Sequence, residues 1–487
     1  MPAARFQGTL EQVDETCFRI PRSYMPGMRV EGLIYADERL IEEVKSGQAP
    51  QQVANVAYLP GIQMASLAMP DIHWGYGFCI GGVCATDPEQ DGVISPGGVG
   101  YDINCGVRLV RTGLAESEVT GRLKGLVDEL FRSIPTGVGR TGKYSFSHQE
   151  LKRMMSEGVS FLRGRGLATD DDVEFTEARG CIEDAEPECV SERALERGTR
   201  QCGTVGSGNH FVEVQVVDEV VDEAAAAAFG LKRGMVCVLI HSGSRGLGYQ
   251  VCDDALRALR DTPARYGVEL PDRQLVCAPI KGPEGRQYLG SMRSAANFAF
   301  CNRQLIMWQT REVFERFFGR SWQQLEMELV YDIAHNIAKF EEHLIEGRRK
   351  RVCVHRKGAT RAFPPGHPEL PARYRPVGQP VMIPGDMGRA SWVLAGAPGS
   401  MLKTFGTTCH GAGRAMSRTA SVKAARGRRI DRELLEAGII ARARSHRGLA
   451  EEQPAAYKDV DLVVDVVHKA GLSTKVARMR PIGVIKG

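Results

Sequence analysis

The chain has 487 residues, of which 43% are hydrophobic and 25% charged; these values are typical of a globular protein and exclude a mostly disordered chain. Its net charge of +4 neither requires nor excludes a polyanionic partner. The thirteen cysteines are scattered singly, without a CxxC pair, which argues against a secretory disulfide framework or a zinc ribbon. The N-terminus lacks an apolar signal core and no apolar stretch approaches about 18 residues, so we expect a cytoplasmic protein without a membrane span.

Helical and strand-like patterns follow one another along the chain. In chain order, a helix is predicted at 123–134, strands at 211–217 and 235–240, helices at 292–318 and 432–444, and a strand at 462–467. This mixture predicts an α/β (mixed α+β) fold.

No linker rich in Pro, Gly or Ser divides the chain. We therefore expect one large domain over 1–487, in which loops at strand ends converge on a single site. A proline-rich loop is predicted at 364–376. Residues 140–200, with an acidic run at 170–172, are predicted to form a variable surface excursion.

Four of the eleven histidines follow or flank apolar runs in glycine-rich or polar contexts. They are His210 in GSGNHF, His241 in IHSGSRGLG, His335 in YDIAHN and His410 in CHGAGR. A hydrogen-bonded turn explains one such histidine well, but four in the same context favour a functional site, because glycine lets a ligand approach the backbone. Of the others, His73 and His355 are candidates for a supporting role. Surface positions are expected for His148, His343, His367, His446 and His468.

The segment GVISPGGVGYDINCGVRLV places a carboxylate and a thiol three positions apart, at Asp102 and Cys105. Both side chains can face one ion. Together with histidines from other loops they form a mixed sulfur, nitrogen and oxygen set, which suits zinc or a mid-row divalent metal such as manganese.

Glycine-rich loops recur: PGGVG, GTVGSGNH, HSGSRGLG, PGDMG and CHGAGR. Their backbone N–H groups can line an anion, although none fits a Walker A loop or a dinucleotide fingerprint. Basic residues gather at 348–361 and 414–429, beside these loops. The combination favours a nucleotide with its metal, and a nucleic-acid backbone as a candidate partner.

Taken together, these segments resemble the RtcB family of RNA ligases. The resemblance runs from PDIHWGYGF at 70 to PIGVIKG at the C-terminus and includes SPGGVGYDINCGVR, GTVGSGNHFVE, HSGSRGLG, HRKGATRAF, PGDMG, TCHGAGRAMSR and AYKDVDLVV. It implies an enzyme that uses GTP and two Mn²⁺ ions to join RNA 2′,3′-cyclic phosphate or 3′-phosphate ends to 5′-hydroxyl ends. Transfer-RNA halves or broken RNA are the implied substrates, archease is a candidate activator, and we expect a monomer.

The resemblance also implies roles for individual residues. The metal ligands would be Asp102, Cys105 and His210 in one site and Cys105, His241 and His335 in the other, with His410 as the nucleophile that accepts GMP. The nucleotide would contact Asn209, Phe211, Glu213, Asn336, Pro384, Gly385, Asp386, Met387, Ser391, Gly411, Ala412, Gly413, Tyr457 and Lys486. Triphosphate or RNA would contact Arg245, Lys357, Arg414 and Arg418.

Elementary chemistry agrees with these roles. A neutral imidazole is a competent nucleophile toward an α-phosphate. The Glu213 carboxylate can accept from N1–H and N2–H of guanine, a donor pair that adenine lacks. Asp386 stands where some relatives carry Ser, which leaves its contact open.

Two other functions remain open from the residues alone. A metal-dependent RNA phosphodiesterase would need the metal ligands but neither His410 nor a guanine pocket. A non-catalytic RNA-binding protein with a structural metal would form no covalent GMP adduct.

Overall fold

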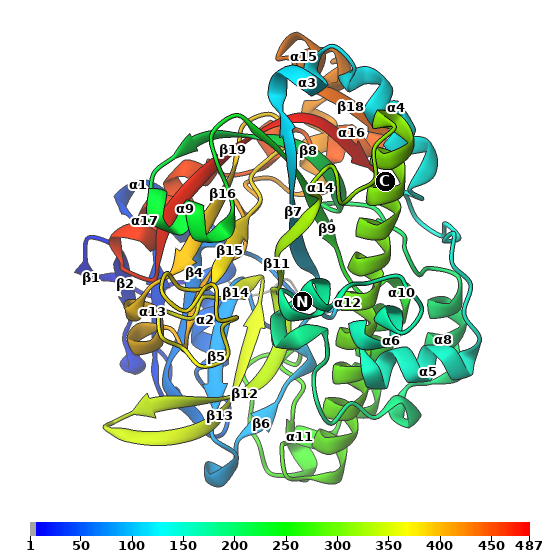
Figure 1. Cartoon of the computed structure of the whole chain (residues 1–487). Coiled ribbons are helices and arrows are strands. Elements are labelled where there is room, and N and C mark those ends of the chain that lie inside the picture. The colour runs from blue at the N-terminus through cyan, green and yellow to red at the C-terminus, as the bar shows by residue number, and fades with distance from the viewer. Residues whose placement is uncertain (1–5) are drawn as a thin grey trace.

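The computed structural model describes residues 6–487, and two large β-sheets form its centre (Figure 1). In spatial order the first sheet contains β1 (Glu11–Asp14), β2 (Cys17–Ile20), β3 (Glu31–Tyr35), β4 (Ile62–His73), β5 (Ile80–Thr86), β13 (Arg348–Lys357) and β12 (Asn336–Ile345). Only β3 and β4 pair in parallel, and the other neighbours are antiparallel.

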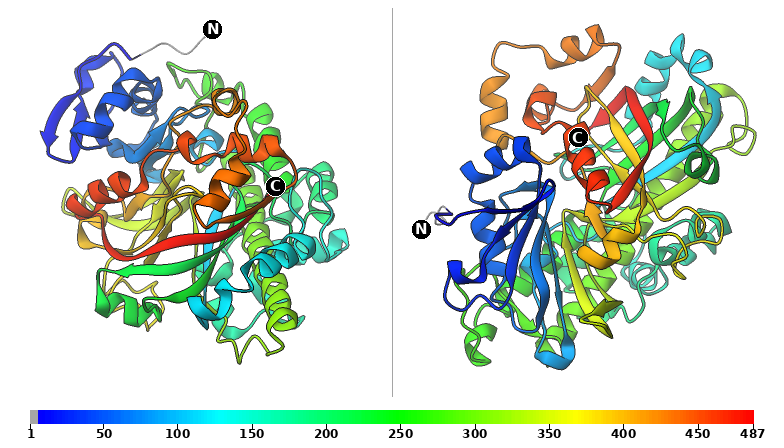
Figure 2. Two further views of the ribbon diagram at one scale, coloured as in Figure 1. Left: turned by 90° about the horizontal axis from the view of Figure 1, so that it is seen from above. Right: turned by 90° about the vertical axis from the view of Figure 1, so that its left-hand side faces the viewer.

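The second sheet is built mainly from later segments. Its strands are β11 (Glu328–Ala334), β7 (Gly106–Ala115), β9 (Met235–Ser242), β8 (Phe211–Val220), β19 (Ser473–Lys486), β16 (Ser391–Gly396) and β15 (Pro380–Ile383), with β18 (Ile440–Ala443) parallel to β19. Two short pairs, β6 (Val93–Ile94) with β10 (Ala278–Pro279) and β14 (Ala359–Arg361) with β17 (Thr407–Cys409), complete the strands. One buried apolar cluster includes residues of both large sheets, for example Val83 and Leu239, and Figure 2 shows the blue N-terminal strands beside the layer that contains the red strand β19.

Helices surround the sheets. They are α1 (Glu38–Ser46), α2 (Ala49–Val56), α3 (Glu116–Thr120), α4 (Leu123–Ser133), α5 (His148–Glu157), α6 (Val159–Arg163), α7 (Asp170–Glu174), α8 (Glu192–Thr199), α9 (Glu223–Phe229), α10 (Arg245–Ala258), α11 (Thr262–Arg265), α12 (Pro283–Phe318), α13 (Pro398–Lys403), α14 (Arg418–Ala424), α15 (Ile430–Glu436), α16 (His446–Glu451) and α17 (Val460–Lys469). The mixed α/β class is thus confirmed, as are the helices predicted at 123–134 and 292–318 and the strands predicted at 211–217 and 235–240. Among the described residues, no helix combines the length and apolar character needed to cross a membrane.

The long helix α12 positions the loops that carry the site. Its buried Arg303 donates to the carbonyl oxygens of Asn104 (2.7 Å) and Ser242 (2.9 Å), and the same guanidinium pairs with Asp332 at 2.7 Å. Because a buried charge is tolerated only when it is paired and hydrogen-bonded, this arrangement ties the loop before β7 to the end of β9.

Residues 140–200 contribute to the interior more than a surface excursion would. Leu151 and Met154 of α5 are fully buried against α12, and the Asp172 carboxylate accepts from both terminal nitrogens of Arg311 at 2.7 and 2.8 Å. The acidic run at 170–172 is therefore not wholly a surface feature. Variation of this segment between relatives stays a prediction.

Two predicted elements near the C-terminus are wrong. The apolar run at 462–467 belongs to helix α17, because Asp459 caps its N-terminus and its buried valines, such as Val460, Val463 and Val467, recur at helical spacing. The helix predicted at 432–444 ends at Glu436. A left-handed Gly438 (φ 80°) breaks it, and strand β18 follows.

Candidate active site

Four strands of the second sheet bring the candidate metal ligands together. Cys105 directly precedes β7, His210 directly precedes β8, His241 lies near the end of β9, and His335 follows β11. β7 pairs with both β9 and β11, and β9 pairs with β8, all antiparallel. In this register the starts of β7 and β8 meet the ends of β9 and β11, so the four side chains share one edge of the sheet.

The ligand atoms converge at contact distance. Cys105 Sγ lies 3.3 Å from His210 Nε2 and 3.2 Å from His241 Nε2, and His241 Nε2 lies 3.2 Å from His335 Nε2. An oxygen of Asp102 lies 2.9 Å from His210 Nε2. The structure therefore assembles all five residues that the sequence nominated as ligands.

The donor set fits a divalent transition metal. His210 Nδ1 lies 3.0 Å from the carbonyl oxygen of Val205, a bond that requires the proton on Nδ1 and turns the Nε2 lone pair toward Cys105. Cys105, His210 and His241 place one ligand atom each within 4.8 Å of one another, and all three residues are buried. Thiolate, imidazole and carboxylate together suit zinc or a mid-row ion such as manganese.

Burial governs protonation here. It lowers the pKa of His241 and of His335 well below the ordinary value, so both imidazoles are neutral and able to ligate. Burial also raises the pKa of the Cys105 thiol. A cation in contact with the sulfur favours its thiolate form.

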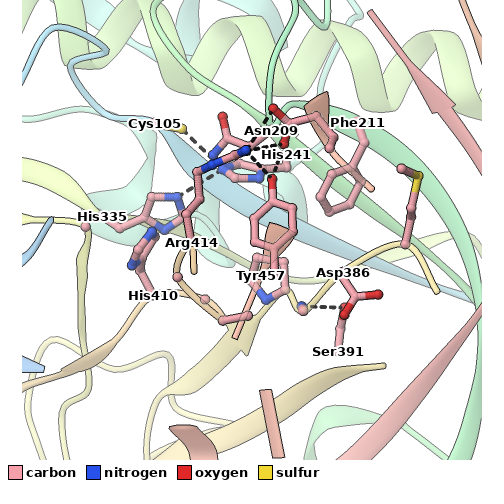
Figure 3. Close-up of a pocket in the computed structure, with 18 of the residues that line it drawn as sticks. Cys105, Asn209, Phe211, His241, His335, Asp386, Ser391, His410, Arg414 and Tyr457 are labelled. Carbon is pink, nitrogen blue, oxygen red and sulfur yellow. Dashed lines mark hydrogen bonds and ion pairs between the residues drawn. The ribbon is translucent and has the colours of Figure 1, made fainter. Parts of the chain in front are cut away.

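His410 lies after β17 and is held by a carboxylate from the other large sheet. A single oxygen of Asp71, in β4, contacts His410 Nδ1 and accepts from the backbone N–H groups of His410 (3.0 Å) and Gly411 (3.3 Å). No described residue hydrogen-bonds to Nε2, and the His410 ring lies 5.1 Å from that of His335 (Figure 3). The ring nitrogen of His410 that remains available in this geometry is therefore Nε2.

His410 and part of the metal cluster open into one cavity of about 190 Å³. Twenty of the residues nominated from the sequence line it: Cys105, Asn209, Phe211, Glu213, His241, His335, Asn336, Pro384, Gly385, Asp386, Met387, Ser391, His410, Gly411, Ala412, Gly413, Arg414, Arg418, Tyr457 and Lys486. Asp102, His210, Arg245 and Lys357 do not belong to this lining. The nominated nucleotide residues thus surround one space, with His410 in its wall.

Strands β8 and β19 contribute a carboxylate, an ammonium and an aromatic ring to the cavity lining. Glu213 is buried, and burial raises its pKa to about 7, while the Lys486 Nζ lies 5.6 Å from the centre of the Phe211 ring. Gln215 donates to Glu213 at 2.5 Å and to the Ser391 hydroxyl at 3.1 Å. Buried carboxylate, buried ammonium and an aromatic ring offer acceptor, donor and apolar contacts within one pocket.

The PGDMG loop closes another side of the cavity. Gly385 N–H donates to the Ser391 hydroxyl at 3.3 Å, and Gly388 N–H donates to Asp386 at 2.8 Å. Burial raises the pKa of Asp386 to about 6. Asn336 connects the loop that carries Asp102 to the turn between β13 and β14. Its side-chain amide donates to the carbonyl oxygen of Asp102 and accepts from the N–H of Gly358.

Two nominated cations lie behind the cavity. Arg245 Nη1 is 3.4 Å from His210 Nδ1, beside the metal cluster. Lys357 is buried and donates to the carbonyl oxygens of Tyr76 and Phe78, and burial lowers its pKa to about 8. In this structure Lys357 secures the loop after β4.

The other two cations face the cavity beside an acid that the sequence did not indicate. Glu452 is 2% exposed, and Arg414 Nη1 lies 3.2 Å from both of its oxygens. Arg418 Nε lies 3.6 Å from the same carboxylate, and the Tyr457 hydroxyl donates to it. Glu452 therefore holds three nominated residues in place.

The basic cluster at 348–361 is not a continuous surface track. Arg356 pairs with Glu341 at 2.6 Å and Arg361 with Glu369 at 2.7 Å, and both arginine side chains are almost fully buried. Arg348, Arg349 and Arg351 are exposed, so only the second half of this cluster is in the interior, where carboxylates pair with its arginines. In the cluster at 414–429, Lys423 and Arg426 are exposed.

Among the predicted surface histidines, His343 is 2% exposed, because β12 buries it beside Glu341 at 3.2 Å. His73 lines the cavity, with Nδ1 2.9 Å from the Asp71 carbonyl oxygen. His355 is buried, and its Nε2 accepts from Ser95 N–H at 3.2 Å.

Asp71 and Glu452 are the important residues that sequence reasoning missed. Asp71 lies 339 positions from His410, so only the fold shows their contact. The single available signal was that Asp71 falls within PDIHWGYGF, a segment already noted for His73. Glu452 has no such signal, since it lies in an ordinary acidic pair.

The chain has close relatives over its full length. A family model described as tRNA-splicing ligase RtcB matches residues 52–487. A Thermococcus kodakarensis protein named tRNA-splicing ligase RtcB is 53% identical over 478 residues, which cover 98% of this chain and 99% of that protein. A Mycobacterium tuberculosis protein named RNA-splicing ligase RtcB is 51% identical over 438 residues, covering 90% of this chain and all of that protein (100%). Matches of this extent show that the chain belongs to the RtcB family.

Proposed function

We propose that this protein is a GTP- and manganese-dependent RNA ligase that joins 2′,3′-cyclic phosphate or 3′-phosphate ends to 5′-hydroxyl ends. The observation that carries the proposal is His410: its Nδ1 is held by Asp71, and the residue lines one cavity with the ligand cluster, Glu213 and Lys486. The relatives' names support RNA splicing as the setting, and repair of broken RNA requires the same chemistry.

Two manganese ions would be held by the cluster, with Cys105 shared, Asp102 and His210 on one side, and His241 and His335 on the other. Such ions neutralise phosphate oxygens and favour an in-line displacement. A mixed thiolate and imidazole set does not by itself distinguish manganese from zinc, so metal dependence of activity is part of the proposal.

The first task of the protein side chains is nucleotide transfer. His410 Nε2 attacks the α-phosphorus of GTP, an N–P bond forms, and the bond to the bridging oxygen of pyrophosphate breaks. The Nδ1 proton remains in the bond to Asp71, whose charge stabilises the developing imidazolium. Asn209, Arg414 and Arg418 line the cavity and would contact the phosphates from its wall.

The second task is activation and sealing of RNA. Water first opens a cyclic phosphate to a 3′-phosphate, an oxygen of which attacks the histidine-bound phosphorus and breaks the N–P bond. The 5′-hydroxyl oxygen then attacks the 3′-phosphate, loses its proton and expels GMP. The new phosphodiester replaces the phosphoanhydride bond to GMP, so bonds and charges balance.

Guanine selection rests on Glu213. Its two oxygens can accept from N1–H and N2–H, and the Lys486 ammonium can donate to O6. These contacts stabilise the ionised carboxylate against the burial that raises its pKa to about 7 in the free pocket. Adenine offers no matching donor pair, which leaves a buried carboxylate unpaired.

One experiment separates this proposal from a phosphodiesterase and from a non-catalytic RNA-binding protein. The protein is incubated with α-labelled GTP and manganese, then analysed by denaturing electrophoresis. We expect a protein-bound label that acid removes and alkali does not, as for an N–P bond, and that is absent from His410→Ala. An unlabelled parent protein would contradict the proposal.

A further inference from the structure

A short stack of side chains stands on the solvent side of the metal cluster. Tyr101 and Tyr249 stack with ring centres 4.8 Å apart and planes 24° from parallel, and Tyr76 meets Tyr101 edge-on at 5.8 Å. The Arg197 guanidinium carbon lies 5.3 Å from the centre of the Tyr249 ring. We call these four residues the aromatic step.

Core packing accounts for Tyr76 and Tyr101, which lie against a buried apolar cluster, but not for Tyr249. Tyr249 is 47% exposed, whereas Leu247 and Val251 of the same helix are at most 3% exposed and make the contacts of α10 with the interior. Single exposed apolar residues are common, but the stacked rings of Tyr101 and Tyr249, near the ligand cluster, present an aromatic face suited to a planar partner.

Each part of the step is tied to the metal cluster. Tyr101 directly precedes Asp102, and Tyr249 lies one helical turn after Arg245, whose guanidinium contacts His210 at 3.4 Å. α8 and α10, which carry Arg197 and Tyr249, pack side by side (Figure 1). Tyr101 and Tyr249 are therefore close in the chain to Asp102 and to Arg245, the two residues that link them to the cluster.

The cluster has two sides, and the nucleotide cavity accounts for only one. Cys105, His241 and His335 line that cavity, whereas Asp102 and His210 do not. The Asp102 side chain is nevertheless 29% exposed, so a second approach from solvent reaches the cluster beside Tyr101.

The geometry of the sealing reaction indicates which RNA strand would bind on the side of the cluster away from the nucleotide cavity. In an in-line displacement the attacking oxygen enters opposite the leaving group. GMP leaves toward its own cavity, so the 5′-hydroxyl must arrive from the opposite side of the phosphate. We propose that the aromatic step binds the terminal nucleobase of the 5′-hydroxyl RNA strand by stacking, an inference that rests on the proposed ligase function.

The charges around the step suit an RNA strand. Arg197 lies against the Tyr249 ring, Arg245 lies beside His210, and Asp253 is paired with Arg257 at 2.6 Å. Bases stack on tyrosine rings and on arginine planes without sequence preference. The step therefore accepts any unpaired 5′-terminal base.

The test is a double-mutant cycle on binding. Tyr249→Ala and Tyr249→Phe are compared with the parent for an unpaired 5′-hydroxyl RNA that carries either a normal or an abasic first nucleotide, with manganese present. Tyr266→Ala, at an exposed tyrosine outside the cavity lining and the step, is the matched control. For normal RNA we expect the Kd to rise about tenfold in Tyr249→Ala and to stay near the parent value in Tyr249→Phe, which keeps the ring. With abasic RNA the parent and Tyr249→Ala should bind alike.

Further measurements identify the strand and isolate the ligase proposal. The fluorescence of 2-aminopurine at the first position of the 5′-hydroxyl strand should be quenched by the parent and not by Tyr249→Ala. In the joining reaction, Tyr249→Ala should show a higher KM for that strand than the parent, with little change in kcat. Equal affinity of the parent and Tyr249→Ala for normal RNA, or a loss confined to the 3′-phosphate strand, would overturn the aromatic step. Failure of the ligase proposal shows separately, as a parent that takes no label from GTP.

Discussion

Asp71 provides the sharpest test of how His410 becomes a nucleophile. Replacement by Asn keeps the shape of a side chain that is fully buried, and the amide oxygen can take the place of the one oxygen that contacts Nδ1 and accepts from two backbone N–H groups. The other Asp71 oxygen has no hydrogen-bond partner among the described residues, so the amide nitrogen displaces no existing bond. Asp71→Asn therefore removes charge with little change of geometry.

The expected loss follows from that charge. In the proposed reaction, attack on the α-phosphorus makes the His410 imidazole cationic. Two unit charges about 4 Å apart interact by about 4 kcal/mol at an effective dielectric constant near 20. If half to all of the charge has developed in the transition state, the loss is about 2–4 kcal/mol, or about 30-fold to about 10³-fold in rate.

The assay is single-turnover labelling of the protein by α-labelled GTP, which measures His410 guanylylation without RNA. Asp71→Ala, which also loses orientation, should be slower still. Melting temperature and manganese content serve as controls for folding and for the neighbouring cluster. A rate for Asp71→Asn within threefold of the parent, with both controls unchanged, would refute the reasoning.

Three other changes test the remaining parts of the site. Cys105→Ala should abolish manganese binding and guanylylation while the protein stays folded, because the shared thiolate belongs to both proposed ion sites; metal analysis and circular dichroism check this, and normal labelling would contradict it. Glu213→Gln should weaken use of GTP by about 1–3 kcal/mol. Since the carboxylate must be ionised to accept from guanine, the parent KM for GTP should rise as pH falls below about 7, and Glu213→Gln should lose this dependence. Deletion of residues 486–487 should impair GMP transfer far more than thermal stability, and full activity of the shortened protein would show that Lys486 does not read guanine.

Much of the candidate site could be predicted because its residues lie in short glycine-rich segments that contain histidine, cysteine or carboxylate side chains beside an apolar strand. Cys105, His210, His241 and His335 each adjoin an apolar strand, and strand pairing alone brings those positions to one edge. Local sequence and sheet register therefore agree, which is the condition under which reading a sequence works best.

What the sequence could not predict depends on contacts across the fold. The valines at 460–467 fit a strand by composition, and only burial on the spacing of a helix decides against it. Arg356 and Arg361 look like surface charges until the buried carboxylates of Glu341 and Glu177 neutralise them in the interior. Asp71 contacts His410, which lies 339 positions away in the chain. Glu452 contacts Arg414 and Tyr457, and these side chains meet only in the folded protein.

Under the proposed function, the two sides of the ligand cluster would let one set of ligands serve every step. Glu213 and His410 line the cavity, whereas Tyr101 and Asp102 do not belong to its lining. Guanine would then remain bound while RNA ends approach from solvent, so the activating nucleotide and the incoming 5′-hydroxyl would not compete for space. The same separation would set the direction of attack, since a strand held at the aromatic step would meet the phosphate from the face opposite GMP. The charges of His410 and Asp71 would then affect only nucleotide transfer, and the Tyr249 ring would affect only binding of the 5′-hydroxyl strand. Variants of the first two residues should therefore impair labelling by GTP, and variants of Tyr249 should impair joining without impairing labelling.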